Sequence, residues 1–295
     1  MPIKWTSIID GYYVVSTISI SIYAYVLNVI ISSKSKAVHS AFFHIFTVTG
    51  VFDIMGVIAY NWVRLDVNFC FGPSFELISR LAAAMTGTNS LTHMIGSLLM
   101  TLNRFTAVLY PDKHGDIWRK RNVCIILAVD VITSYLVYIP LYSNKMHYDQ
   151  RDDRWCCDGR EEPVNELRII SATIVFFYEF ISIILIMKTI CGMNKALHVN
   201  AFKHSQNMRL LVVTAISCLL SVFELIYEFS SLSIMEYVIN HKLDWFLKQY
   251  DKYFLLFMTI NAYSIVLLSK AVRHELAQRW HRRLPYWDFP KVAVF

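Results

Sequence analysis

Acidic side chains stand within long apolar runs of this sequence, where they could bind a ligand or hold a proton. Glu224 and Glu228 are one helical turn apart, so they face the same way on a helix. Together with Glu179 they could bind a cationic ligand or share a proton. They could equally pair with Arg80 or Lys252. Such carboxylates must have partners, because one at mid-bilayer costs roughly 2.5–3.5 kcal/mol on insertion scales.

Three further polar residues interrupt earlier apolar runs. Asp53 must face inward and be paired, solvated or protonated, and its role is either functional or purely structural. Asp130 lies in the fourth run and poses the same question. Asn28 is a lone amide, which we expect to bond a neighbouring helix or a carbonyl.

The elements that hold these residues are transmembrane helices. Of 295 residues, 56% are apolar and only 17% are charged, against about 25% charged in soluble domains. Apolar runs long enough to span a bilayer recur along the chain. The sequence therefore predicts an all-α membrane protein, a bundle of seven transmembrane helices within residues 1–271. We expect the spans at about 12–31, 41–62, 75–110, 122–142, 167–190, 208–231 and 253–270.

The third run, 75–110, is too long and too polar to face lipid throughout. At 1.5 Å per residue it would reach roughly 50 Å, so it must be tilted or project from the membrane. Its many hydroxyl and amide groups need partners, which places it inside the bundle. Arg104 near its end is either a functional residue or an arginine that snorkels to the interface.

Residues 272–295 form a cytoplasmic tail that begins with a short amphipathic helix. Apolar residues recur every four positions at Val272, Leu276, Trp280 and Leu284, with arginines on other faces. This pattern is typical of a helix lying in the membrane surface. The alternative is a basic tail with chance spacing.

The distribution of Lys and Arg predicts the orientation. The loops after spans one, three and five and the tail carry more Lys and Arg than the other connections. The positive-inside rule then places the N-terminus outside the cell and the C-terminus in the cytoplasm. Cys70 falls on the outer side with Cys156 and Cys157, so we expect a disulfide from Cys70 to either of them.

Several site classes are not expected. Basic residues do not form an aromatic-interleaved patch, which argues against nucleic-acid binding. The cysteines and histidines lack a regular four-ligand spacing, so we expect no metal and no cofactor. Hydrolase and metalloprotease motifs are absent, so we expect no enzyme.

The end of the third run resembles a known receptor superfamily. Leu102-Asn103-Arg104-Phe105, followed by Pro111, is similar to the Asp-Arg-Tyr…Pro pattern of rhodopsin-like G-protein-coupled receptors. The longer stretch Leu-Asn-Arg-Phe-Thr-Ala-Val-Leu-Tyr-Pro, with Ile117-Trp118 beyond it, resembles nematode serpentine chemoreceptors of class gamma, the Srg-like receptors.

The resemblance implies a chemosensory receptor that binds a small-molecule or pheromone-like ligand and signals to a heterotrimeric G protein. It also implies a cell-membrane address, with the ciliary membrane of sensory neurons as the finer expectation. The residues expected to couple or switch are Asn103, Arg104, Phe105, Pro111, Asp53, Asn28 and Asn261. Two departures stand out. Asn103 replaces the usual acid, and Asn261 is all that span seven keeps of Asn-Pro-x-x-Tyr.

A receptor of this kind would bind its ligand between spans three, five, six and seven. We chose lining candidates by depth and polarity, and helix–helix packing is the alternative for each. They are Met85, Thr86, Asn89, Ser90, Tyr178, Glu179, Glu224, Tyr227, Glu228 and Phe257. The rival function is an ion- or proton-coupled transporter or channel, since such proteins use membrane carboxylates. The sequence predicts no oligomeric state.

Overall fold

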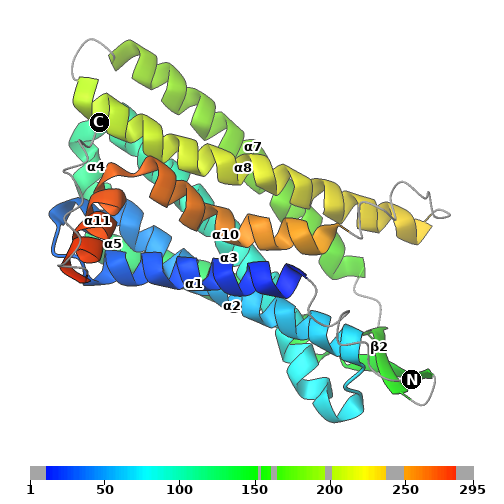
Figure 1. Cartoon of the computed structure of the whole chain (residues 1–295). Helices are drawn as coiled ribbons and strands as arrows, with labels where there is room; N and C mark the ends of the chain where they lie inside the picture. Colours follow the sequence, from blue (N-terminus) through cyan, green and yellow to red (C-terminus); the bar gives the residue numbers. More distant parts are fainter. Residues whose placement is uncertain (1–10, 152–153, 161–164, 197–200, 237–248, 284–295) are drawn as a thin grey trace.

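Seven long helices form most of the described part of the protein (Figure 1). The computed structural model describes residues 11–151, 154–160, 165–196, 201–236 and 249–283. The long helices are α1 (Gly11–Ser32), α2 (Ala41–Phe69), α3 (Glu76–Leu109), α5 (Lys120–Val137), α7 (Asn165–Ala196), α8 (Ala201–Glu236) and α10 (Tyr250–Leu268). They run roughly along one direction and pack side by side, with α7 and α8 together on one flank of the bundle (Figure 1).

Shorter elements close the two ends of this bundle. At one end lie α4 (Pro111–Ile117), the 3₁₀ turn η2 (Lys36–His39) and α11 (Lys270–Arg283), and we call it the α11 end. At the other lie the turn η3 (Pro73–Phe75), α6 (Ile139–Ser143) and a hairpin of β1 (Met146–Arg151) and β2 (Arg154–Arg160). We call it the hairpin end. Residues 143–166, expected as a loop, thus contain an antiparallel strand pair.

Five of these helices, α1, α2, α7, α8 and α10, are long and apolar enough to cross a membrane. Large apolar side chains such as Phe176, Phe177 and Phe180 are exposed along α7, as expected where lipid covers a bundle. Helices α3 and α5 complete the bundle with a more polar composition. The predicted seven-helix membrane fold is confirmed.

The polar side chains of α3 lie inside the bundle. Thr88, Asn89, Thr92, His93 and Ser97 are all at most 1% exposed. Several hydroxyl groups form hydrogen bonds within α3 itself. Thr88 and Thr92 donate to carbonyl oxygens one turn earlier, at 3.0 and 3.1 Å. This local bonding lets a helix of low hydropathy sit in an apolar environment.

Helix bounds differ from the expected spans chiefly at the ends. α2 continues past residue 62 to Phe69 and ends at Cys70, which adopts a left-handed conformation with φ of 53°. The expected span 122–142 is two helices, because α5 ends before Pro140 and α6 begins beside it. α7 and α8 both extend beyond the expected spans toward the α11 end.

Helices α2 and α3 approach closely at glycines. A Cβ on Gly96 would lie 2.1 Å from Thr49 Oγ1, and one on Gly56 would lie 3.1 Å from Asn89 Cβ. Neither α3 nor α2 could keep this spacing with a larger residue at these points. The two helices therefore form one tightly packed pair.

The first two residues of the expected apolar stripe, at the start of the amphipathic helix α11, pack on protein. Val272 is fully buried and Leu276 packs against the apolar core at this end. The Arg279 guanidinium donates to the backbone oxygen of Val29 at 3.3 Å and to Ser32 Oγ. The side chain of Trp280 and the whole of Leu284 lie outside the described part of the chain.

A disulfide joins the hairpin to the end of α2. It links Cys70 to Cys156, and Cys157 takes no part in it. The Tyr148 hydroxyl of β1 donates to Asp66 Oδ2 of α2 at 2.9 Å. Burial, and then the neighbouring Asp66 carboxylate, raise the pKa of the Tyr148 phenol. The hairpin is therefore held to α2 by one covalent and one polar contact.

Candidate functional site

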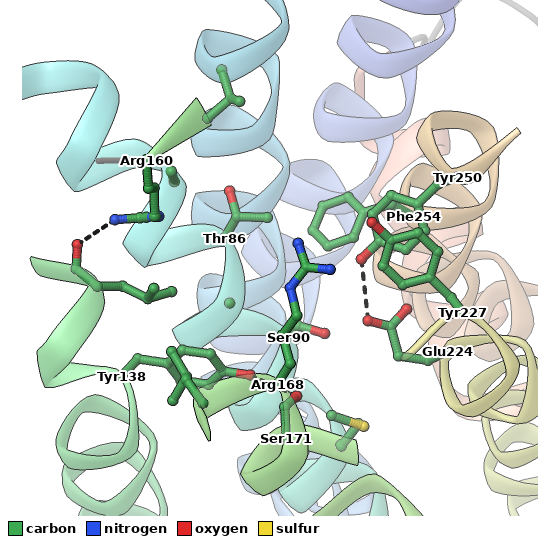
Figure 2. A pocket seen from close by; sticks show the side chains of 16 residues that line it. Thr86, Ser90, Tyr138, Arg160, Arg168, Ser171, Glu224, Tyr227, Tyr250 and Phe254 are labelled. Atoms are coloured by element: carbon green, nitrogen blue, oxygen red, sulfur yellow. Dashed lines mark hydrogen bonds between the residues drawn. The ribbon is translucent and has the colours of Figure 1, made fainter. Parts of the chain in front are cut away.

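A cavity of about 400 Å³ lies within the bundle near the hairpin end (Figure 2). Its walls come from α3, α7, α8 and α10, with Tyr138, Leu141 of α6 and Arg160 of β2 closing one side. This volume falls within the range of small-molecule sites. The lining is mostly apolar, with a few polar groups that converge on the space, as ligand pockets require.

One wall is aromatic and carries an acid. The rings of Tyr227 on α8 and Tyr250 on α10 stack with centroids 3.8 Å apart. The Tyr250 hydroxyl donates to Glu224 Oε1 at 3.1 Å (Figure 2). Phe254 completes this wall and lies 5.9 Å from the Tyr250 ring, centroid to centroid. Glu224 is only 4% exposed and therefore depends on such bonds.

The opposite wall is made by hydroxyl groups and arginine. The hydroxyls of Tyr138 and Ser171 lie 3.1 Å apart. The Arg160 guanidinium donates to the backbone oxygens of Leu141 and Asn144 at 2.8 and 3.0 Å. Burial lowers the pKa of Arg160, and the nearby Arg80 lowers it further. This side of the cavity therefore includes the Arg160 guanidinium.

Arg168, in the first turn of α7, points into the cavity toward the aromatic wall (Figure 2). The side chain is half-buried. Among the described residues it has no hydrogen bond or ion pair. A guanidinium in this position is available to a ligand.

A buried polar network lies deeper in the bundle. Asp53 of α2 accepts from the Tyr23 hydroxyl of α1 at 2.6 Å, and its other oxygen lies 2.8 Å from His93 Nδ1 of α3. His93 Nε2 is 3.3 Å from Ser217 Oγ of α8, which is 3.0 Å from Ser97 Oγ. Four helices thus meet through one chain of hydrogen bonds.

A comparison with known families identifies the class of protein that contains this cavity. A family model described as serpentine type 7TM GPCR chemoreceptor Srv matches residues 12–282. The chain belongs to this Srv family. It is a multi-pass membrane protein and a chemosensory receptor. A search of curated proteins gives no significant match.

The Srv assignment confirms the nematode serpentine chemoreceptor resemblance but corrects the class. We expected class gamma, and Srv is a different class. The sequence match around Arg104 that pointed to class gamma covers only about 15 residues. The family model instead spans nearly all of the helical bundle. A short sequence motif around one arginine is therefore weaker evidence for the receptor class than a match over the whole chain.

The Srv receptor's cavity includes four of the ten expected lining residues: Thr86, Ser90, Glu224 and Tyr227. Five others lie elsewhere: Met85, Asn89, Tyr178, Glu179 and Phe257. The side chain of Glu228 lies outside the described residues.

The five that lie elsewhere have packing environments. Tyr178 is 5% exposed in the apolar core, and the ring of Phe257 lies 4.3 Å from that of His93. Glu179 accepts from the Cys218 thiol at 3.2 Å, so it is not grouped with Glu224 around the cavity. Asn89 is fully buried against α2, and Met85 is half-buried. Neighbouring positions on a helix face different directions, which depth alone does not resolve.

The expected switch residues of the Srv receptor also differ in burial. Asn103 and Arg104 are buried at the α11 end of α3, where Arg104 donates to Asn103 Oδ1 and lies 4.9 Å from the Phe42 ring centroid. Arg104 is only 7% exposed, so it does not snorkel to the surface. Phe105 is half-buried, and Pro111 is exposed at the first position of α4.

Asn28 departs from its expected position. It is exposed on α1, and its Oδ1 accepts from Ser32 of the same helix at 3.2 Å. Within the described chain it therefore bonds its own helix and not a neighbour. Asn261 is buried in α10, and no hydrogen bond to its side chain occurs among the described residues.

Sequence reasoning did not select Arg160, Arg168, Tyr138, Ser171 and Tyr250 as lining residues. A signal existed for Arg168, which sits just inside an apolar run and so qualifies as an intramembrane charge. His93, the partner of Asp53, was not selected either. Over the described ranges, no group of three His, Cys, Asp or Glu side chains could hold a metal ion.

Proposed function

We propose that this Srv receptor binds an extracellular chemical cue in the cavity near the hairpin end and signals to a heterotrimeric G protein at the α11 end. The cavity carries the proposal, because it joins a small-molecule volume to convergent polar groups. Its hairpin end faces outside in the proposed orientation. The Cys70–Cys156 disulfide supports this, since such bonds persist in oxidising compartments.

The route from cavity to G protein follows α3. Ser90 lines the cavity, and His93, one turn further, belongs to the network that joins α1, α2, α3 and α8. Arg104 lies about 20 Å along the helix from Ser90, at 1.5 Å per residue. Ligand would shift a two-state equilibrium of the bundle by its different affinities for the two states. The readout would be the surroundings of Arg104.

The partner surface in this proposal is the basic α11 end. Exposed Lys113, Arg119, Lys120 and Arg121 lie on α4, on α5 and between them. Positive groups on this side agree with a cytoplasmic location. In sensory neurons the proposed address is the ciliary membrane, on family grounds.

A surface-expression and signalling assay tests the proposal. The receptor carries an N-terminal tag, and staining without permeabilisation reports whether the N-terminus is outside. Cells are then exposed to small volatile and water-soluble molecules, and a G-protein-dependent response is recorded.

Arg104→Ala is the decisive variant. We expect it to lose the response at unchanged surface level. Loss of surface delivery alone would assign Arg104 a structural role. A ligand-driven current or uptake that survives G-protein blockade would overturn the receptor mechanism in favour of a transporter or channel.

A further inference from the structure

The cavity holds a positive charge that the described residues do not neutralise. Arg168 points into the space and has no hydrogen bond or ion pair among the described residues. A guanidinium that is partly removed from water is stabilised by a counter-charge, and it binds carboxylates through two parallel hydrogen bonds. Arg160 adds a second guanidinium to the lining, although it already donates to backbone oxygens.

A hydroxyl group on the facing helix α3 also lacks a hydrogen-bond partner among the described residues. Ser90 of α3 is 5% exposed, lines the cavity, and has no hydrogen-bond partner for its Oγ in the described structure. Leaving a buried hydroxyl without a partner is unfavourable, because the group has lost its hydrogen bonds to water. A ligand oxygen placed between α3 and α7 would accept from Ser90 and Arg168 together.

One carboxylate oxygen of the cavity's acid already accepts a hydrogen bond. Glu224 accepts from Tyr250, whose ring stacks on Tyr227. This carboxylate therefore has a neutral donor at its side, whereas the Arg168 guanidinium has no acceptor among the described residues. The remaining lining, including Met94, Leu167 and Phe254, is apolar. It fits the uncharged body of a ligand.

We propose that the ligand is an amphiphilic anion, with a carboxylate held by Arg168 and Ser90 and an apolar body against Tyr227, Tyr250 and Phe254. This inference rests on the proposed function, because it assumes that the cavity is the ligand site. It replaces the cationic ligand that the acidic residues of the sequence suggested.

Direct binding to purified receptor in lipid nanodiscs tests the inference. The probes are ω-phenylalkanoates of increasing chain length, each compared with the amine and the alcohol of the same chain. Ligand-induced thermal stabilisation gives the apparent affinities. We expect the best carboxylate to bind about tenfold to one hundredfold more tightly than its alcohol, and the amine not to bind.

Variants of Arg168 sharpen the test. Arg168→Gln removes the preference for carboxylate, Arg168→Lys keeps most of it, and Arg168→Glu shifts the preference to the amine. Lys188→Gln is the matched control, because Lys188 is an exposed cation about 30 Å further along α7 and does not line the cavity. It leaves all affinities unchanged.

The outcomes separate this inference from the proposed function. The inference is overturned if no carboxylate binds at millimolar concentration, if amine or alcohol binds as well, or if Arg168→Gln keeps the preference. A G-protein response to an uncharged or cationic probe would overturn it while supporting the receptor mechanism. Carboxylate binding through Arg168 without any G-protein response would support it while contradicting the proposed coupling.

Discussion

Asp53 and His93 form a fully buried pair across α2 and α3, with Asp53 Oδ1 2.8 Å from His93 Nδ1. Neither side chain is exposed at all. Tyr23 donates to the second Asp53 oxygen, so the acid that looked isolated in the sequence is enclosed by partners from two other helices. An intramembrane carboxylate is tolerated here because its hydrogen-bonding capacity is met inside the bundle.

The first prediction concerns this pair. Asp53→Ala should lower the free energy of unfolding by about 1–3 kcal/mol, because His93 and Tyr23 lose their common acceptor. Thermal unfolding of purified receptor gives the single variants and the Asp53→Ala/His93→Ala double variant. We expect a coupling energy of about 0.5–3 kcal/mol. Additive effects would show that the two side chains do not depend on each other.

The second prediction concerns the contact of α2 with α3. Gly96→Ala should destabilise the receptor by about 1–3 kcal/mol, because the new Cβ would lie 2.1 Å from Thr49 Oγ1. Adding Thr49→Ala should recover part of this loss. Gly115→Ala is the control, since a Cβ there has no heavy atom within 4 Å. Equal stability of the Gly96 and Gly115 variants would contradict the close packing.

The third prediction separates the outer cysteines. Cys70→Ser and Cys156→Ser should reduce stability and surface level equally, by about 2–5 kcal/mol in unfolding free energy, because the bond closes a connection of 86 residues. Cys157→Ser should have a smaller effect, since Cys157 takes no part in this disulfide. Surface staining and thermal unfolding measure the three variants. A larger loss for Cys157→Ser than for Cys156→Ser would mean that the other cysteine forms the bond.

The fourth prediction concerns pH. The folded-state pKa of Tyr148 is raised by burial and by Asp66, so its phenol stays protonated in the folded protein above the ordinary value of about 10. The unfolded chain ionises first, and the contribution of Tyr148 to stability is therefore full below pH 10 and falls as pH rises. The stability difference between wild type and Tyr148→Phe should accordingly shrink in alkaline buffer. A difference that grows there would contradict the raised pKa.

The membrane fold could be predicted from the sequence because each apolar run carries its own signal. For α3 the expected span 75–110 differs from Glu76–Leu109 by one residue at each end. The inward placement of its polar residues followed from the cost of unpaired groups in lipid. The bounds of α3 and the burial of its polar residues could be predicted because both depend on the local sequence.

The lining of the cavity depends on how each helix is rotated about its axis, and local sequence does not encode this. Glu179 and Glu224 look alike as acids in apolar runs, yet only Glu224 reaches the cavity. Arg168 looks like an interfacial cation at the start of a span, yet its side chain turns inward. Asn28 was expected to face a neighbour and is exposed. Packing between distant segments fixed these outcomes.

The close pairing of α2 and α3 has a mechanical consequence. Gly96 against Thr49, Gly56 against Asn89 and the Asp53–His93 pair fasten the two helices over about two turns near their middle. The disulfide fastens the hairpin to the end of α2 as well. We therefore expect α2, α3 and the hairpin to stay fixed relative to one another as a rigid unit. We expect the conformational change on ligand binding to occur in α7, α8 and α10, which would rotate or slide against this rigid unit.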